Sequence, residues 1–168
     1  MLSVTRADAI GFQLDMAIRL WFEGSDPISA HTLACNALHV AHDLGKVYGK
    51  KSMLIDSLPK EHHKAAAEAQ NFFKHADKDP HKVLSFNPEL TRYHIFDAVN
   101  LYSQLFRGYS PPMATFLLRC SIVDPSIRIE KIAEKFSSRL DKAALAKMNN
   151  QEFFANVMPV FMRQANVR

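Results

Sequence analysis

Apolar residues recur three or four positions apart along most of the chain, which is the spacing of one face of an α-helix. The first predicted helix runs from about Arg6 to Glu23, and its apolar face carries Ile10, Leu14, Ala17, Ile18 and Trp21. No stretch alternates apolar and polar residues between turn residues, so no strand is assigned. The pattern predicts an all-α fold, a helical bundle of about seven or eight helices without a sheet.

Prolines preceded by capping residues mark predicted helix starts. Five of the eight prolines follow Asp, Asn or Ser, whose side-chain oxygens accept hydrogen bonds from the free amides of a first helical turn: Asp26-Pro27, Asp79-Pro80, Asn87-Pro88, Ser110-Pro111 and Asp124-Pro125. No apolar periodicity follows Asp79-Pro80, so this pair is predicted to lie in a loop. The remaining helices are predicted over about 27–44, 59–74, 88–106, 111–122, 125–136, 142–147 and 151–165.

The C-terminal part of the chain is predicted to form a helical arm. Residues 111–122 are nearly all apolar and are expected to form a buried central helix, and a polar segment around residues 141–152 suggests a hinge. We therefore expect a core over residues 1–123 and an arm over residues 124–168 of the same domain. The last helix carries an apolar stripe, interrupted by Pro159, of Phe153, Phe154, Val157, Met158, Phe161 and Met162. Such a stripe covers its own core or a partner, and we expect a homodimer with this helix at or beside the interface.

Composition favours a single soluble domain. The chain has 168 residues, 48% of them hydrophobic and 23% charged, which is near the globular average. No apolar run is long enough to span a membrane, and no signal peptide is evident at the N-terminus. Two cysteines without CxxC spacing fit a reducing cytoplasm better than a disulfide scaffold. A net charge of +4 mildly favours an anionic partner, although the basic residues are scattered.

The segment "HDLGK", from His42 to Lys46, resembles the motif of HD-type metal phosphohydrolases. That resemblance implies a metal held by His42, Asp43 and a histidine on a preceding helix. The predicted helix over residues 6–23 contains no histidine. We therefore favour a structural interpretation, in which Gly45 supplies the left-handed residue after the last helical turn and Lys46 offsets the helix dipole.

A second candidate metal set lies on the same predicted helix. His31, Cys35 and His39 are four residues apart, and adjacent members could share a zinc ion. The two outer residues, however, lie about 12 Å apart along a straight helix, and His31 and His42 about 16 Å apart. No metal and no other cofactor is therefore expected.

The segment "QNFFKHADKDP", from Gln70 to Pro80, is the stronger candidate for a site. Asn71, Lys74 and His75 are spaced to share one face at the end of a predicted helix, and Asp77 follows directly. An imidazole beside an ammonium and an amide, next to a long loop, is suited to holding a phosphate or ribose. The alternative is structural: His75 and Asp77 cap the helix and order the loop.

Together with the later "FNPEL", this segment resembles a group of uncharacterised bacterial helical proteins over roughly residues 10 to 123. It is also similar, more distantly, to the motif of HEPN (higher eukaryotes and prokaryotes nucleotide-binding) domains, which are helical, often dimeric and in many cases metal-independent ribonucleases. The resemblance implies that His75 is the catalytic base and that Asn71 is the polar motif residue. Gln70 stands where the motif has Arg, so Lys74 would have to replace the missing charge.

The leading functional expectation is a HEPN-like module that binds RNA or a nucleotide, with ribonuclease activity either retained or lost. The binding residues would be Gln70, Asn71, Lys74 and Asp77, with His75 as the catalytic residue. The alternatives are a non-catalytic protein-interaction or structural helical protein and, third, an HD-like metal phosphohydrolase.

Overall fold

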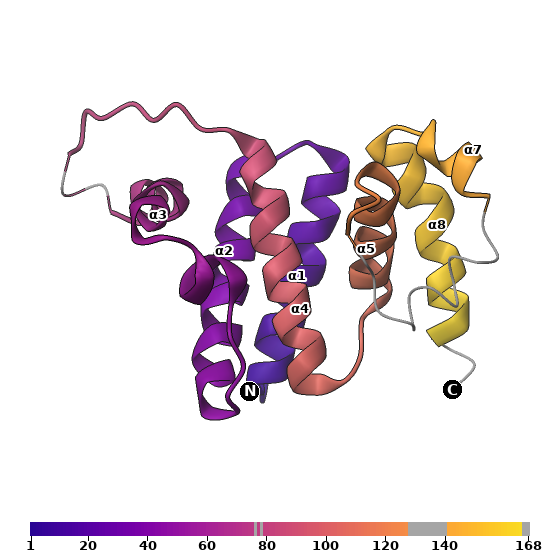
Figure 1. Ribbon diagram of the computed structural model, residues 1–168, viewed down its shortest axis with the longest axis horizontal. Coiled ribbons are helices and arrows are strands. Elements are labelled where there is room, and N and C mark those ends of the chain that lie inside the picture. Colours follow the sequence, from indigo (N-terminus) through magenta and orange to yellow (C-terminus); the bar gives the residue numbers. More distant parts are fainter. Residues whose placement is uncertain (76, 78, 128–140, 166–168) are drawn as a thin grey trace. The chain divides into compact units, whose positions relative to one another are not determined.

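The computed structural model describes residues 1–75, 77, 79–127 and 141–165. Within these ranges every regular element is helical, which confirms the all-α fold class. In chain order the elements are α1 (Arg6–Glu23), α2 (Pro27–Val47), the π-helix η1 (Met53–Ser57), α3 (Lys60–Lys74), the 3₁₀ helix η2 (Pro88–Leu90), α4 (Thr91–Phe106), α5 (Pro111–Val123), α7 (Lys142–Ala146) and α8 (Asn150–Ala165) (Figure 1). No helix among the described residues is both long and apolar enough to cross a membrane.

The chain divides into two compact units, Met1–Gly108 and Tyr109–Arg168. This division falls earlier in the sequence than the expected boundary after residue 123. It places α5 with α7 and α8, because α5 packs against both of those helices. The apolar helix that the sequence suggested as the centre of the whole bundle is therefore the main buried helix of the second unit.

In the first unit, α1, α2 and α4 pack against one another, α3 packs beside α2 (Figure 1), and η1 packs against α4 and α3. The predicted apolar face of α1 is confirmed at Ile10, Leu14, Ala17 and Ile18, which are fully buried. Trp21 is only partly buried, and Phe22 takes the core position instead. Phe22 continues the four-residue spacing of Leu14 and Ile18, so it lies closer to the centre of the buried face.

The capping residues that predicted helix starts perform that role at three positions. The carboxylate of Asp26 accepts from the Ser29 amide at 2.9 Å, the Asn87 side chain accepts from the Glu89 amide at 3.1 Å, and the Ser110 hydroxyl accepts from the Met113 amide at 3.3 Å. Asn87 begins η2, which leads directly into α4.

Asp124 lies at the end of α5, where its amide donates to the Cys120 carbonyl. Its carboxylate accepts from the amide of Ser126 at 3.0 Å, as a helix start would require. The helix predicted over 125–136 falls largely outside the described residues.

The end of α2 corrects one sequence expectation. Gly45 does not end the helix in a left-handed conformation; it is buried within α2, which continues to Val47. The left-handed residue is Gly49, with φ +64°. The amides of Lys50 and Gly49 donate to the carbonyls of Gly45 and Lys46, the two bonds of a Schellman motif. The chain returns so close over Gly45 that a Cβ atom there would lie 3.3 Å from the Lys50 carbonyl oxygen.

In the second unit, α5 and α8 pack together around a buried arginine. The guanidinium of Arg119 donates to Asn150 Oδ1 at 3.1 Å, to the Met148 carbonyl at 3.0 Å and to the Leu145 carbonyl at 3.4 Å. It also lies over the ring of Phe153, 5.0 Å from its centroid. Burial lowers the pKa of this guanidinium. Arg119 therefore ties the α7–α8 connection to α5.

The apolar stripe of α8 is divided between core and surface. Phe153, Val157 and Phe161 are buried in their own chain. Phe154 and Met158 are partly buried, and Met162 is 43% exposed. The first three residues already have their apolar surface covered, so a homodimer through this helix would have to use Phe154, Met158 and Met162.

Candidate functional site

The sequence-predicted site lies at the C-terminal end of α3. Asn71, Lys74 and His75 are all exposed there, and Asp77 is exposed just beyond the helix. The amide of His75 donates to the Asn71 carbonyl at 3.0 Å, so His75 is the residue at which the helix ends. Asn71, Lys74 and His75 are thus exposed within about one turn of the same helix end.

Gln70 does not belong to this exposed group. Its side chain is 7% exposed, and its Oε1 accepts from Nε2 of His39 on α2 at 2.9 Å. This contact holds α3 against α2 and turns the amide inward. The sequence places Gln70 among the binding residues with Asn71, Lys74 and Asp77, but its side chain is buried against α2 rather than exposed with theirs, because packing against α2 decides which face of α3 is buried.

Gln70 and His39 instead line a small pocket between α2, η1, α3 and α4. The pocket has a volume of about 140 Å³, and its walls are Leu38, His39, Leu54, Ile55, Ala67, Gln70 and His94. Pockets that hold drug-sized ligands are usually larger, about 300–1,000 Å³. This one has room for a small group only.

A cluster of rings around the buried His31 lies beside the pocket. His31 on α2 is 1% exposed and makes edge contacts with Phe73, Phe86 and His94, at centroid separations of 6.1, 5.1 and 4.7 Å. Phe73 comes from α3, Phe86 from the loop before η2, and His94 from α4. The loop that follows the predicted site is therefore anchored in the core through Phe86.

Polar contacts orient the two histidines of this cluster. Nδ1 of His31 lies 3.1 Å from the Thr91 hydroxyl, and its Nε2 lies 3.4 Å from Sγ of Cys35. Nδ1 of His94 lies 3.0 Å from the Leu90 carbonyl oxygen. A carbonyl only accepts, so Nδ1 of His94 carries the proton and Nε2 is the basic nitrogen.

Burial keeps the His31 imidazole and the Cys35 thiol uncharged near neutral pH. The pKa of His31 falls to about 4, because burial and the nearby imidazole of His94 disfavour its protonated form. The pKa of the Cys35 thiol rises to about 12, because burial outweighs the attraction of the Lys74 ammonium. Neutral imidazoles with basic nitrogens are the form in which histidine binds metals.

His31, Cys35 and His94 together form a possible ligand set. Each offers one donor atom, and the three atoms lie within 4.8 Å of one another. Spacing along α2 alone suggests His39 as the third member beside His31 and Cys35. His39 instead bonds to Gln70, and His94 arrives from a helix about 60 residues later, a proximity that no local spacing could reveal.

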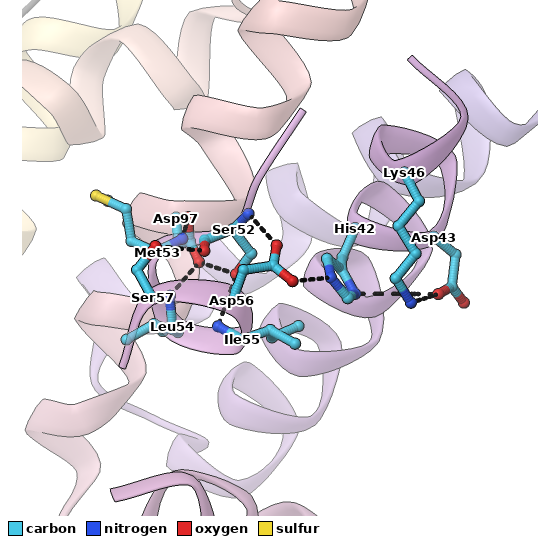
Figure 2. Close-up of polar contacts among 10 residues, drawn as sticks. All are labelled: His42, Asp43, Lys46, Ser52, Met53, Leu54, Ile55, Asp56, Ser57 and Asp97. Carbon is cyan, nitrogen blue, oxygen red and sulfur yellow. Dashed lines mark hydrogen bonds and ion pairs between the residues drawn. The ribbon is translucent and has the colours of Figure 1, made fainter. Parts of the chain in front are cut away.

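The HD-like pair is engaged in structural contacts. Nε2 of His42 lies 3.0 Å from Oδ1 of Asp56 in η1, and Lys46 donates to the exposed carboxylate of Asp43 at 3.1 Å (Figure 2). Oδ2 of Asp56 accepts from the Ser52 amide at 2.7 Å. His42 therefore fastens η1 to α2 through Asp56, while its Nδ1 lies 4.0 Å from Oδ1 of Asp43, the same oxygen that accepts from Lys46 (Figure 2).

Comparison with known proteins adds no family to these observations: no protein-family model, curated protein or solved structure matches the chain. The resemblances to the bacterial helical proteins and to HEPN domains stay predictions from the sequence. The function has to be argued from the side chains and their contacts.

Proposed function

We propose that the chain is a helical module that binds RNA or a nucleotide through the exposed face formed by Asn71, Lys74 and His75. The observation that supports this proposal is that all three side chains are exposed around one helix end. An ammonium attracts a phosphate group, while the amide and imidazole can donate hydrogen bonds to phosphate or ribose oxygens. The net charge of +4 favours the approach of such an anion.

Two features limit the affinity of this face. The C-terminal end of a helix carries the negative end of the helix dipole, which repels an anion. Asp77 and Asp79 are also exposed in the loop that follows. Lys74 must offset both effects, so binding should be weak and should depend strongly on salt and on this one side chain.

Ribonuclease turnover is not part of the proposal. HEPN-type chemistry uses an arginine near the histidine to hold the phosphate during attack by the 2′-hydroxyl, and Lys74 can supply a positive charge here but not the paired donors of a guanidinium. Gln70, which stands at that motif position, is buried and bonded to His39. These side chains therefore support a HEPN-like module that binds RNA or a nucleotide but has lost the ribonuclease activity.

The test measures binding of a fluorescent single-stranded RNA and of labelled nucleotides by anisotropy at several salt concentrations. Lys74→Ala should weaken binding and lower the slope of log affinity against log salt by about 0.7, the loss of one phosphate contact on a single strand. Lys46→Ala is the matched control, since it removes an exposed lysine that pairs with Asp43 on α2. Equal binding by the parent and Lys74→Ala would refute the proposal.

The same preparations test for catalysis. Any cleavage of RNA that survives EDTA and disappears in His75→Ala would show that the ribonuclease activity is retained. We expect no such cleavage, because no arginine stands at the Gln70 position.

The alternative, a non-catalytic protein-interaction module, is favoured by one observation on α1. Phe12 and Met16 are 68% and 49% exposed one turn apart, which presents adjacent apolar side chains to solvent. An HD-like metal phosphohydrolase is not proposed, because His42 is bonded to Asp56 and Asp43 to Lys46.

A further inference from the structure

The buried residues His31, Cys35 and His94 have the chemistry of a transition-metal ligand set. Imidazole and thiolate are the side chains that most often bind zinc. In a tetrahedral zinc site, bonds of about 2.0–2.1 Å to nitrogen and 2.3 Å to sulfur place neighbouring ligand atoms about 3.3–3.6 Å apart. Nε2 of His31 and Sγ of Cys35 are 3.4 Å apart, and the whole set lies within 4.8 Å. Small side-chain rotations would bring all three to bonding distance.

The histidines are also held in the orientation that metal binding needs. Metal-binding histidines usually donate the other ring N–H to a carbonyl, carboxylate or similar acceptor, which fixes the tautomer and the ring plane. Nδ1 of His94 donates to the Leu90 carbonyl at 3.0 Å. Nδ1 of His31 lies 3.1 Å from the Thr91 hydroxyl, which can accept from it and leave Nε2 basic beside Cys35.

The elements around the set fix its geometry. His31 and Cys35 are one turn apart on α2, and His94 is on α4, which packs directly against α2. All three side chains are at most 8% exposed, so their rotamers are restricted by packing. His94 also lines the 140 Å³ pocket, so the set adjoins a space large enough for a water molecule on the His94 side.

From this geometry we infer that the chain binds one Zn²⁺ ion through His31, Cys35 and His94, with a water molecule completing the tetrahedron. The ion would replace the thiol proton of Cys35 and leave a single positive charge in the buried cluster. From the sequence, no metal is expected at His31, Cys35 and His39, because three ligands on one straight helix lie too far apart. His94 comes from α4, so it can approach His31 and Cys35 from the side. The inference is independent of the proposed RNA- or nucleotide-binding function.

The test begins with the full chain, stripped of metal and kept reduced with a phosphine. Titration with Zn²⁺ against a chromophoric chelator should show one ion bound per chain. Titration with Co²⁺ should produce a sulfur-to-cobalt charge-transfer band and intense visible bands of a tetrahedral site. The cobalt spectrum reports thiolate coordination in the unaltered protein, so it does not depend on any variant folding.

Variants then identify the ligands. Cys35→Ala should abolish the charge-transfer band and weaken Zn²⁺ binding by more than about 100-fold. This loss of affinity is larger than the one usually caused by replacing a residue that only hydrogen-bonds to a metal ligand. Cys120→Ala, which removes the other buried thiol, and His39→Ala should bind like the parent. Thr91→Val should weaken binding by about 10- to 100-fold, because it removes the hydrogen bond that orients His31.

Two results would overturn the inference. One is a cobalt complex without a charge-transfer band, which would mean that no thiolate is bound. The other is Zn²⁺ affinity that is equal in the parent and in a folded Cys35→Ala variant, which would indicate adventitious binding elsewhere on the chain.

Discussion

The hydroxyl of Ser52 donates to Oδ2 of Asp97 at 2.6 Å, and this contact joins the start of η1 to the middle of α4 (Figure 2). The same carboxylate accepts from the amides of Met53 at 3.1 Å and Leu54 at 2.9 Å, while the Ser52 oxygen accepts from the Ile55 amide at 2.9 Å. Free amides at the beginning of the π-helix are thus satisfied by a residue more than 40 positions later in the sequence.

Asp97→Ala should destabilise the first unit by about 3 kcal/mol, because it leaves three donors near a buried site without their acceptor. Urea denaturation followed by Trp21 fluorescence would measure the change in the free energy of unfolding. Gln104→Ala on the same helix is exposed and should change this free energy by less than about 0.5 kcal/mol. A similar, small effect of both substitutions would show that the Asp97 contacts contribute little.

The bond between His42 and Asp56 predicts a pH dependence of stability. Burial raises the pKa of Asp56, but the hydrogen bonds from His42 and the Ser52 amide outweigh it, and the pKa lies below its ordinary value of 3.8. The folded state therefore binds this proton less readily than the unfolded state. The resulting stabilisation is present above pH 3.8 and is lost as the pH falls through the lower, folded-state pKa.

Asp56→Asn should consequently be less stable than the parent near neutral pH, and the difference should shrink in acid. Urea denaturation at intervals from about pH 6 down to about pH 3 would show this convergence. Asp79→Asn, which alters an exposed loop carboxylate, serves as the control and should follow the parent. A gap between parent and Asp56→Asn that stays constant across this range would contradict the prediction.

Arg119→Met should loosen the second unit. The substitution preserves much of the apolar stem but removes the donors to the Leu145 and Met148 carbonyls and to Asn150. The free energy of unfolding of the second unit should fall by about 3 kcal/mol, which is typical of losing several hydrogen bonds from a buried charged group. Hydrogen exchange of peptides covering α7 and α8 should accelerate accordingly. Arg163→Met, on the exposed part of α8, should leave their exchange unchanged.

The expected homodimer can be tested on the exposed edge of the α8 stripe. Light scattering at micromolar concentration should report a dimer, and Met162→Glu should shift it towards monomer by placing a charge in the interface. Met16→Glu is the matched control on α1, where Met16 is similarly exposed. A parent protein that is already monomeric at this concentration would show that Phe154, Met158 and Met162 do not form such an interface.

The sequence by itself determined where most helices begin. Asp26, Asn87 and Ser110 each accept from an amide two or three residues later, so the interaction is complete within the local sequence. Helical spacing likewise identified the buried face of α1, because the 3.6-residue period depends on the backbone alone. The same periodicity predicts that Asn71, Lys74 and His75 share one face of α3, whereas their exposure depends on how α3 packs.

The tertiary structure decided the features that depend on which elements meet. Gln70 is buried because α3 packs against α2, and Gly45 stays within its helix because the chain folds back over it at Lys50. His94 reaches His31 and Cys35 only because α4 packs beside α2. Such contacts join residues far apart in the sequence, and they are selected by the shared burial of whole helix faces rather than by the spacing within any one segment.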